Sequence, residues 1–212
     1  MTGQLNNTTP SFFGTITKCI DTRLTSLHTA MPGVVDSYDR LKKTASIKPA
    51  LQRQMPDGTS ASLPVIPNVP VMFPQTANAL ISWPLTKGDT GLIVFSERSI
   101  DRWKTLGGVV NPKDLRKHDF SDALFYPGLM AAGQGKTPDP DALLIQMGSL
   151  SLKLFTGGKI SVSNGSIDLI DKLVELGRQI QAITVVTALG VQPIVNQAAI
   201  QTLVDSIEEF KV

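Results

Sequence analysis

Half of the chain's fourteen prolines lie between Pro49 and Pro84, and this cluster restricts the local fold more than any other feature. Because proline fixes φ and lacks a backbone donor, a helix is excluded over this stretch. Apolar residues alternate with the prolines in LPVIPNVPVMFP (63–74), which distinguishes the stretch from a low-complexity linker. The pattern predicts extended chain, with edge strands and loops.

Charge is distributed unevenly. Residues 58–86 and 179–204 contain no aspartate, glutamate, lysine or arginine, and charged residues make up only 18% of the chain. A monomeric domain usually carries charges spread over its surface. The two uncharged stretches therefore predict surfaces that are covered, most simply by other copies of the same chain.

Composition excludes several functional classes. The net charge of +2 argues against specific nucleic-acid binding. One cysteine, Cys19, cannot form an intrachain disulfide or a thiolate zinc site, and two histidines leave little material for a metal centre. We expect no secretory signal, because the chain does not start with a basic segment followed by an apolar one. We also expect no transmembrane helix, because no apolar run is long enough.

The first two thirds predict short strands with turns between them, as in a small β-barrel or sandwich. A mixed-charge run over 97–122 predicts a solvated loop or a short helix beside the barrel. We expect strands at 13–20, 24–30, 34–38, 44–51, 80–84 and 91–96, turns at 31–33 and 87–90, and a hairpin at 55–58.

After a Gly/Pro/Asp linker at 131–141, the sequence alternates between apolar and polar residues as far as 163. This predicts a hairpin or meander with one apolar face, which is too small to be stable alone. The stripe that needs a partner comprises Leu150, Leu152, Leu154, Ile160 and Val162.

From Ile167 the apolar period becomes helical, with Ser166 as the expected N-cap. Gly190 and Pro193 end the pattern, and a returning helix follows. For residues 179–204 we weigh a membrane-active segment against a helical oligomer core, and the glutamines there favour the core. The expected helical core comprises Ile170, Leu173, Val174, Ile180, Leu203 and Ile207.

The sequence carries no convincing catalytic constellation. His118, Asp119 and Asp122 could form half of a hydrolytic site, but a surface histidine in a charged loop explains them better. Cys19 lies in an apolar run that favours a buried, inert thiol. Gly157-Gly158-Lys159 lacks the spacing of a phosphate loop. We therefore expect neither an enzyme nor a cofactor.

Five ordered motifs between residues 10 and 130 resemble the small central-spike, membrane-piercing proteins of contractile-tailed bacteriophages. They are HTAMPGVVDSY (28–38), Leu63-Pro64 with VPVMFP (69–74), Trp83-Pro84-Leu85 before Gly88-Asp89, FSERSIDRW (95–103), and RKHDFSDA (116–123) with Pro127-Gly128. The matching positions include Pro32, Gly33, Pro70, Phe73, Gly88, Asp89, Asp101, Trp103 and Asp122.

The resemblance implies a fold and an assembly. The fold would be mainly β with an α-helical C-terminal part: an OB-fold barrel (1–130), a linker (131–142), a short intertwined trimeric β-helix or prism (143–165) and a C-terminal helical hairpin or bundle (166–212). The chain would be a homotrimer at the centre of the tail baseplate, made in the host cytoplasm and incorporated into the virion.

The resemblance also implies partners. These are the baseplate hub and tail-tube proteins, and the host envelope, which would be contacted transiently. A separate tip protein at the C-terminal end is a further option. Such spikes often end in a His-x-His iron site, but no histidine follows His118, so we expect no iron. The alternative functions are a saccharide- or partner-binding OB module and, third, a peptidoglycan hydrolase.

Overall fold

The computed structural model describes residues 11–55, 57–193 and 196–211. The chain divides into two compact units, unit 1 (Met1–Gly135) and unit 2 (Lys136–Val212). It is mainly β with a few helices, as the sequence predicts. The division falls within the Gly/Pro/Asp stretch, which contains no regular secondary structure.

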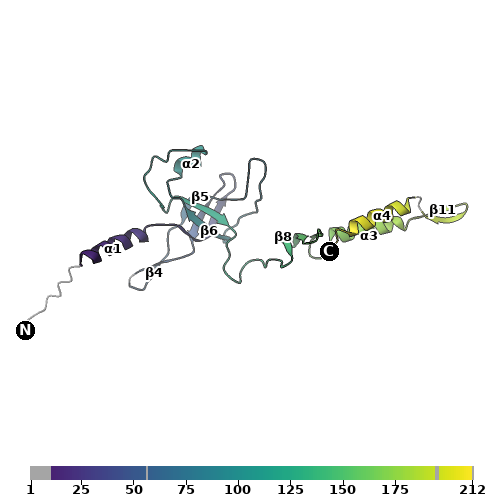
Figure 1. Ribbon diagram of the computed structural model, residues 1–212, viewed down its shortest axis with the longest axis horizontal. Coiled ribbons are helices and arrows are strands. Elements are labelled where there is room, and N and C mark those ends of the chain that lie inside the picture. Colours follow the sequence, from purple (N-terminus) through teal and green to yellow (C-terminus); the bar gives the residue numbers. More distant parts are fainter. Residues whose placement is uncertain (1–10, 56, 194–195, 212) are drawn as a thin grey trace, which may run out of the picture. The chain divides into compact units, whose positions relative to one another are not determined.

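Unit 1 is built on a curled five-stranded antiparallel sheet (Figure 1). The strand order is β5-β2-β1-β6-β7. An isolated bridge between Val71 and Phe125 joins the two edges, and the Met72 N–H donates to the Phe125 carbonyl at 2.8 Å. The strands are β1 (Ala30–Asp39), β2 (Thr44–Pro49), β5 (Ile66–Pro70), β6 (Thr90–Phe95) and β7 (Ala123–Pro127).

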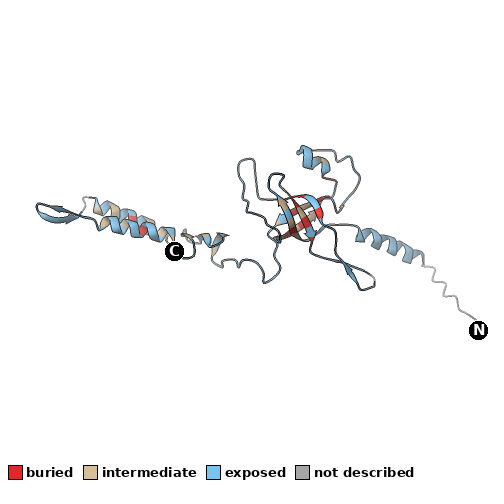
Figure 2. Ribbon diagram, turned by 180° about the vertical axis from the view of Figure 1, so that it is seen from behind, coloured by how far each residue is buried: buried red, intermediate tan, exposed pale blue. Residues whose placement is uncertain are grey.

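The core of unit 1 lies on the inner face of this sheet (Figure 2). Alternate residues of β2 and β6 are buried, as the period of a strand requires when one face meets a core. The buried apolar side chains are Val35, Ala45, Ile47, Ile66, Val69, Val71, Ile93, Phe95, Ala123 and Phe125.

Two glycines at the centre of the sheet make room for this core. Gly33 of β1 pairs with Gly91 of β6. A Cβ on Gly33 would lie 2.6 Å from the Ile93 side chain, and a Cβ on Gly91 would lie 2.3 Å from the Tyr126 carbonyl oxygen. Both distances are far below van der Waals contact, so the packing of the core requires the absence of a side chain at both positions.

Smaller elements complete unit 1. Helix α1 (Phe12–Thr25) precedes the sheet, and helix α2 (Asp101–Leu106) lies between β6 and β7. A short hairpin pairs β3 (Arg53–Gln54) with β4 (Ser60–Ala61), which confirms the turn expected near Gly58. Pro56 of that turn lies outside the described residues. The mixed-charge run contains the short helix that the sequence predicts.

The strands expected at 13–20 and 24–30 are wrong, because residues 12–25 form helix α1. Threonine and isoleucine favour strands locally, yet Ile16, Ile20 and Leu24 recur at helical spacing. Ser11 caps the helix by accepting a hydrogen bond from the Gly14 N–H at 3.1 Å. Cys19 lies on this helix and is exposed, so the expected buried thiol is also wrong.

Two further local predictions fail. The turn expected at 31–33 lies inside β1, because Gly33 serves close packing and not chain reversal. The strand expected at 80–84 is mostly loop, with one bridge between Leu80 and Gln75. The prediction of extended chain over the proline cluster is confirmed by β5 and its flanking loops.

Unit 2 contains a three-stranded antiparallel sheet of order β10-β9-β8 and a pair of helices. The two helices run side by side, and a two-stranded hairpin connects them (Figure 1). The elements are β8 (Ala142–Met147), β9 (Leu150–Phe155), β10 (Ile160–Ser163), α3 (Leu169–Gln181), β11 (Thr184–Thr187), β12 (Gly190–Pro193) and α4 (Gln197–Glu208).

The predicted strands and both predicted helices of unit 2 are present, but their boundaries differ. Asp168, and not Ser166, caps α3 by accepting from the Ile170 N–H at 2.8 Å. Helix α3 ends at Gln181, before the predicted Ile183, because the β-branched run that follows forms β11.

We expect Gly91→Ala to destabilise unit 1 by about 1–3 kcal/mol or more, since the new methyl group meets the backbone of β7. Both tryptophans of the chain lie in unit 1, so urea unfolding followed by tryptophan fluorescence measures this unit. The exposed Ser37→Ala in β1 is the control and should leave the midpoint unchanged. Equal stability of the Gly91→Ala and native proteins would contradict the packing argument.

Candidate assembly surface

The three-stranded sheet of unit 2 gathers eight aliphatic side chains on one face. Residues paired across an antiparallel ladder point to the same side, and the register aligns apolar with apolar throughout. The rows are Leu143–Leu154–Ile160, Ile145–Leu152–Val162 and Met147–Leu150.

In the described part of unit 2 this face is most open along β8, whereas Leu152, Ile160 and Val162 are half-buried. Leu143, Ile145, Met147 and Leu150 are 56–69% exposed. The opposite face is more polar, with Gln146, Ser151, Lys153, Ser161 and Ser163 beside Ala142, Leu144 and Phe155. An uncovered aliphatic face of this size beside a polar one marks an interaction surface.

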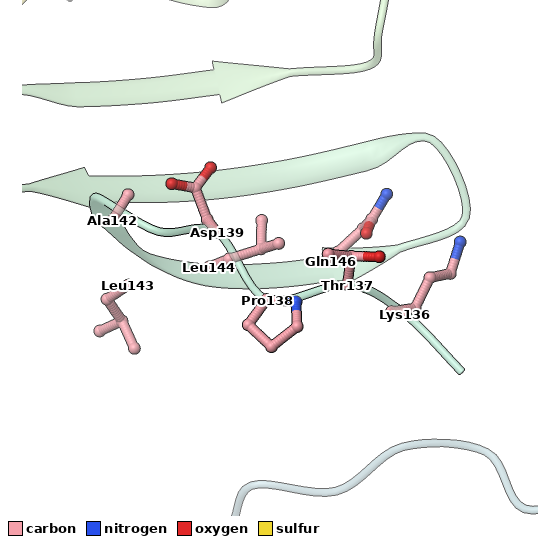
Figure 3. Close-up of a pocket in the computed structure, with 8 residues that line it drawn as sticks. All are labelled: Lys136, Thr137, Pro138, Asp139, Ala142, Leu143, Leu144 and Gln146. Carbon is pink, nitrogen blue, oxygen red and sulfur yellow. The ribbon is translucent and has the colours of Figure 1, made fainter. Parts of the chain in front are cut away.

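The polar face has a partner within the chain. Lys153 pairs with Asp139 of the segment before β8, with Nζ 2.8 Å from Oδ2. The hydrogen bond from Lys153 lowers the pKa of Asp139. Figure 3 shows residues 136–139 running beside β8, and Leu143 and Leu144 pointing in opposite directions from the strand. This contrast identifies the aliphatic face as the side left for a partner.

The sequence-predicted stripe lies entirely on the aliphatic face. The sequence reasoning missed three of its members, Leu143, Ile145 and Met147. Alternation of apolar and polar residues around Gln146 predicted a strand there, but the sequence alone did not give the register in which that strand pairs with β9. The structure therefore enlarges the predicted surface from five residues to eight.

The predicted helical core separates into two groups. Val174 and Val204 are the only buried side chains among the described residues of unit 2, and they lie between the two helices. A Cβ on Gly177 would lie 2.5 Å from Val204, which shows how closely the helices approach. Ile170 and Ile207 are half-buried, whereas Leu173, Ile180 and Leu203 are exposed.

Polar contacts hold the helices together and attach them to the sheet. Lys211 pairs with Asp171 at 2.9 Å, and Arg178 pairs with Glu208. The Ile160 N–H donates to the Phe210 carbonyl at 2.9 Å, and the Ser161 hydroxyl donates to the Asp168 carboxylate. Sheet and helical hairpin therefore form one body.

In unit 1, the predicted motif residues have structural roles, and the most constrained is Asp122. Its carboxylate is completely buried and accepts two hydrogen bonds from Arg116, at 2.6 and 2.9 Å, and one from the Ile100 N–H at 3.0 Å. Arg116 also pairs with Asp101 and Asp114. This network ties the loop after β6 to the start of β7.

Burial opposes ionisation of Asp122, but the hydrogen bonds from Arg116 and the Ile100 N–H outweigh it and lower the pKa of the carboxyl group. The same hydrogen bonds from Arg116 to Asp122 and Asp101 raise the pKa of the guanidinium group. Both groups therefore stay charged. The interpretation of the mixed-charge run 97–122 as solvated is wrong at Asp122, because two hydrogen bonds from the Arg116 guanidinium group allow the Asp122 carboxylate to be buried.

The other motif residues shape turns and packing. Gly88 adopts φ +98°, and its N–H donates to the Val35 carbonyl at 2.9 Å, while Asp89 accepts from the Thr86 N–H at 2.6 Å. The ring of Phe73 lies 5.1 Å from that of Trp83 in an edge-to-face contact. Pro32 and Gly33 lie in β1, Pro70 ends β5, and Trp103 lies half-exposed on α2.

The histidines are anchored in the fold. The His28 ring contacts that of Phe95 at a tilt and that of Phe120 edge-on, and the His28 backbone N–H donates to the His118 carbonyl at 3.2 Å. Burial, followed by the positive charge of Arg53, lowers the pKa of His28. Within the described ranges, no three histidine, cysteine, aspartate or glutamate side chains gather as metal ligands would.

Part of the chain matches a known protein family. Residues 31–128 match the family model for the phage protein Gp138 N-terminal domain. The match indicates a phage protein. The matched range starts at the second residue of β1 and ends one residue after β7, so it coincides with the curled sheet. No curated protein matches the chain.

None of the helices in the described part of the chain is long and apolar enough to cross a membrane.

We expect Arg116→Met to destabilise unit 1 by about 3–5 kcal/mol, since it leaves the Asp122 carboxylate buried without a counter-ion. Tryptophan fluorescence in urea measures the loss. The double variant Arg116→Met with Asp122→Asn should recover part of it, because the uncompensated charge is then absent. Additive losses in the double variant would contradict this coupling.

The lowered pKa of Asp122 also predicts a pH dependence. Its contribution to stability is present above the unfolded carboxyl pKa and is lost as the pH falls through the lower, folded pKa. The urea midpoint of unit 1 should therefore fall from pH 6 to pH 3 by more in the native protein than in Asp122→Asn. An identical fall in both proteins would show that Asp122 does not contribute.

Proposed function

We propose that this chain is a structural protein of the phage virion that assembles as a homotrimer and forms the central spike of a contractile tail. In this role it has no enzymatic activity. Its partners are two further copies of itself and the baseplate hub and tail-tube proteins, and it contacts the host envelope transiently. The OB-type fold of unit 1 and the prism formed by unit 2 are parts of the same proposal.

The observation that carries the proposal is the aliphatic sheet face of unit 2. Burial of an exposed leucine, isoleucine or methionine contributes about 1.5–3 kcal/mol per side chain, and this face offers eight. Two buried side chains are far too few to hold unit 2 together as a monomer. A surface shared between identical chains supplies the missing core.

The sheet edges favour three copies over two. A face-to-face dimer would cover the aliphatic faces but leave β8 and β10 of each copy as open edges. Three sheets around an axis bring β8 of one copy beside β10 of the next, which closes the ring and removes all edges. The side chains then fill the interior of a stiff rod, which suits force transmission along a tail.

Unit 1 supports the tail assignment. Across the sheet the strands lie in the order β5-β2-β1-β6-β7, so β1 is central. The Val71–Phe125 bridge joins the residue after β5 to β7 and links the two edges of the sheet. A five-stranded, partly open barrel is the OB architecture. Together with the match to a phage domain over 31–128, this supports a barrel that docks on the hub.

The test uses two adjacent residues on opposite faces of β8. Ile145→Asp places a charge on the aliphatic face, whereas Gln146→Asp places the same charge on the polar face. Light scattering at micromolar concentration should give the mass of a trimer for the native chain and for Gln146→Asp, and a monomer for Ile145→Asp. Leu152→Asp in β9 should behave as Ile145→Asp does.

A folded native monomer would overturn the proposal, and a stable Ile145→Asp trimer would overturn the inward assignment of this face. The tail assignment has its own measurement. Quantitative mass spectrometry of purified virions should find three copies of the chain per tail. Absence from virions that contain their other tail proteins would reject the spike.

A further inference from the structure

The helical hairpin of unit 2 has a second apolar stripe that its own chain leaves uncovered. Along α3, Leu169, Leu173, Leu176 and Ile180 follow one another at spacings of four, three and four residues, and Ile183 lies three residues further on, past the end of the helix. These five side chains are 39–52% exposed. We call them the α3 seam.

The spacing of the α3 seam is that of a heptad repeat. Apolar residues alternating at three and four residues keep one side of a helix facing a parallel partner, so that each side chain inserts between those of the next helix. No charged residue interrupts the series.

The other side of α3 is already occupied. Ile170, Val174, Gly177 and Gln181 repeat at spacings of four, three and four, and this side meets α4 at Val204. The Gln181 amide donates to the Gln201 side chain at 2.6 Å across the same contact. The two stripes of α3 therefore have different partners, and the chain itself supplies only one.

Helix α4 does not offer an equivalent surface. Its stripe has two exposed large apolar side chains, Leu203 and, just past the end of the helix, Phe210, and Thr202 and Ser206 lie on the outward side of the helix. Its remaining apolar residues near the seam spacing, Ile200 and Ile207, are half-buried. A central position for α3, with α4 outside, buries more apolar surface than the reverse arrangement.

We infer that the α3 seam packs against the α3 seams of the other copies, forming a parallel coiled coil at the centre of the assembly with the α4 helices around it. The inference rests on the proposed self-association of unit 2. It adds to that proposal that α3, and not α4, lines the axis of the assembly. It also assigns Val174 to the contact between α3 and α4 of the same chain. Leu169 and Leu176, which the sequence reasoning did not select, become core positions.

Identical chains fit the seam better than lipid does. Helix α3 has thirteen residues and carries Lys172, Glu175 and Arg178 within the turns that bear the seam. The contacts of Ile160 with Phe210 and of Ser161 with Asp168 attach the helices to the sheet. Copies joined through the sheet would therefore have their α3 helices close together, at high effective concentration.

Disulfide trapping in the full-length chain tests the inference. Cys19 is exposed and is first replaced by serine. In that background, Leu176→Cys and Ile180→Cys should form interchain disulfides under mild oxidation, giving a two-chain band on a non-reducing gel, because seam positions lie within disulfide reach across the axis. Thr202→Cys, on the outward side of α4, is the matched control and should stay unlinked.

The outcomes separate the two proposals. If light scattering gives a trimer but neither seam cysteine links, the α3 seam is not at the axis, and the proposed trimer stands. Linking at Thr202→Cys without linking at Leu176→Cys would place α4 at the axis and also overturn the inference. If light scattering gives a monomer mass for both the native chain and the Cys19→Ser variant, both proposals are overturned.

Discussion

The structure depends on an imbalance between apolar surface and apolar core in its C-terminal unit. Eight aliphatic side chains on one face of a sheet and the five of the α3 seam are matched by two buried valines. Folding must offset the conformational entropy of the ordered residues, and two buried valines contribute only a small part of that. The proposed association through these surfaces would account for the regular alternation of the strands, the heptad spacing of α3 and the scarcity of charge between 179 and 204.

The N-terminal unit has the opposite character, because it contains its own core. The glycine pair Gly33–Gly91 lets the sheet curl tightly around Ile93 and Phe125. The Arg116–Asp122 pair then holds the charged segment that connects β6 to β7. Unit 1 is thus held by contacts within the chain, whereas unit 2 leaves most of its apolar surface exposed within one chain.

The sequence predicted features whose cause is local. Alternation at 150–154 and 160–163 fixes strands, and prolines at 49–84 exclude helices. It failed where the deciding contact lies far away in the sequence. Nothing near Gly33 shows that Ile93 will fill the space above it, and nothing near Asp122 shows that the Ile100 N–H, 22 residues earlier, will donate to its buried carboxylate. Helix α1 was missed because β-branched residues occupy positions that also fit a helical period.

The candidate surface was predicted in kind but not in extent. Leu150, Leu152 and Leu154 marked an apolar stripe, whereas Leu143, Ile145 and Met147 joined it only through the β8–β9 register. Similarly, helical periodicity found apolar residues on α3 but could not divide them between α4 and other copies. That division depends on the position of Gly177 against Val204, a contact between residues 27 positions apart.

The two buried valines of unit 2 have a consequence for how the protein comes to be made. A unit whose core exists only between chains cannot finish folding on one chain, so its folding rate and its stability both depend on protomer concentration. On the proposed association, unit 1 can fold within a single chain, whereas unit 2 exposes its apolar faces until copies meet. Dilute expression should therefore yield chains with a native barrel and a C-terminal part open to proteases, and the assembled form should accumulate only as the chain becomes abundant.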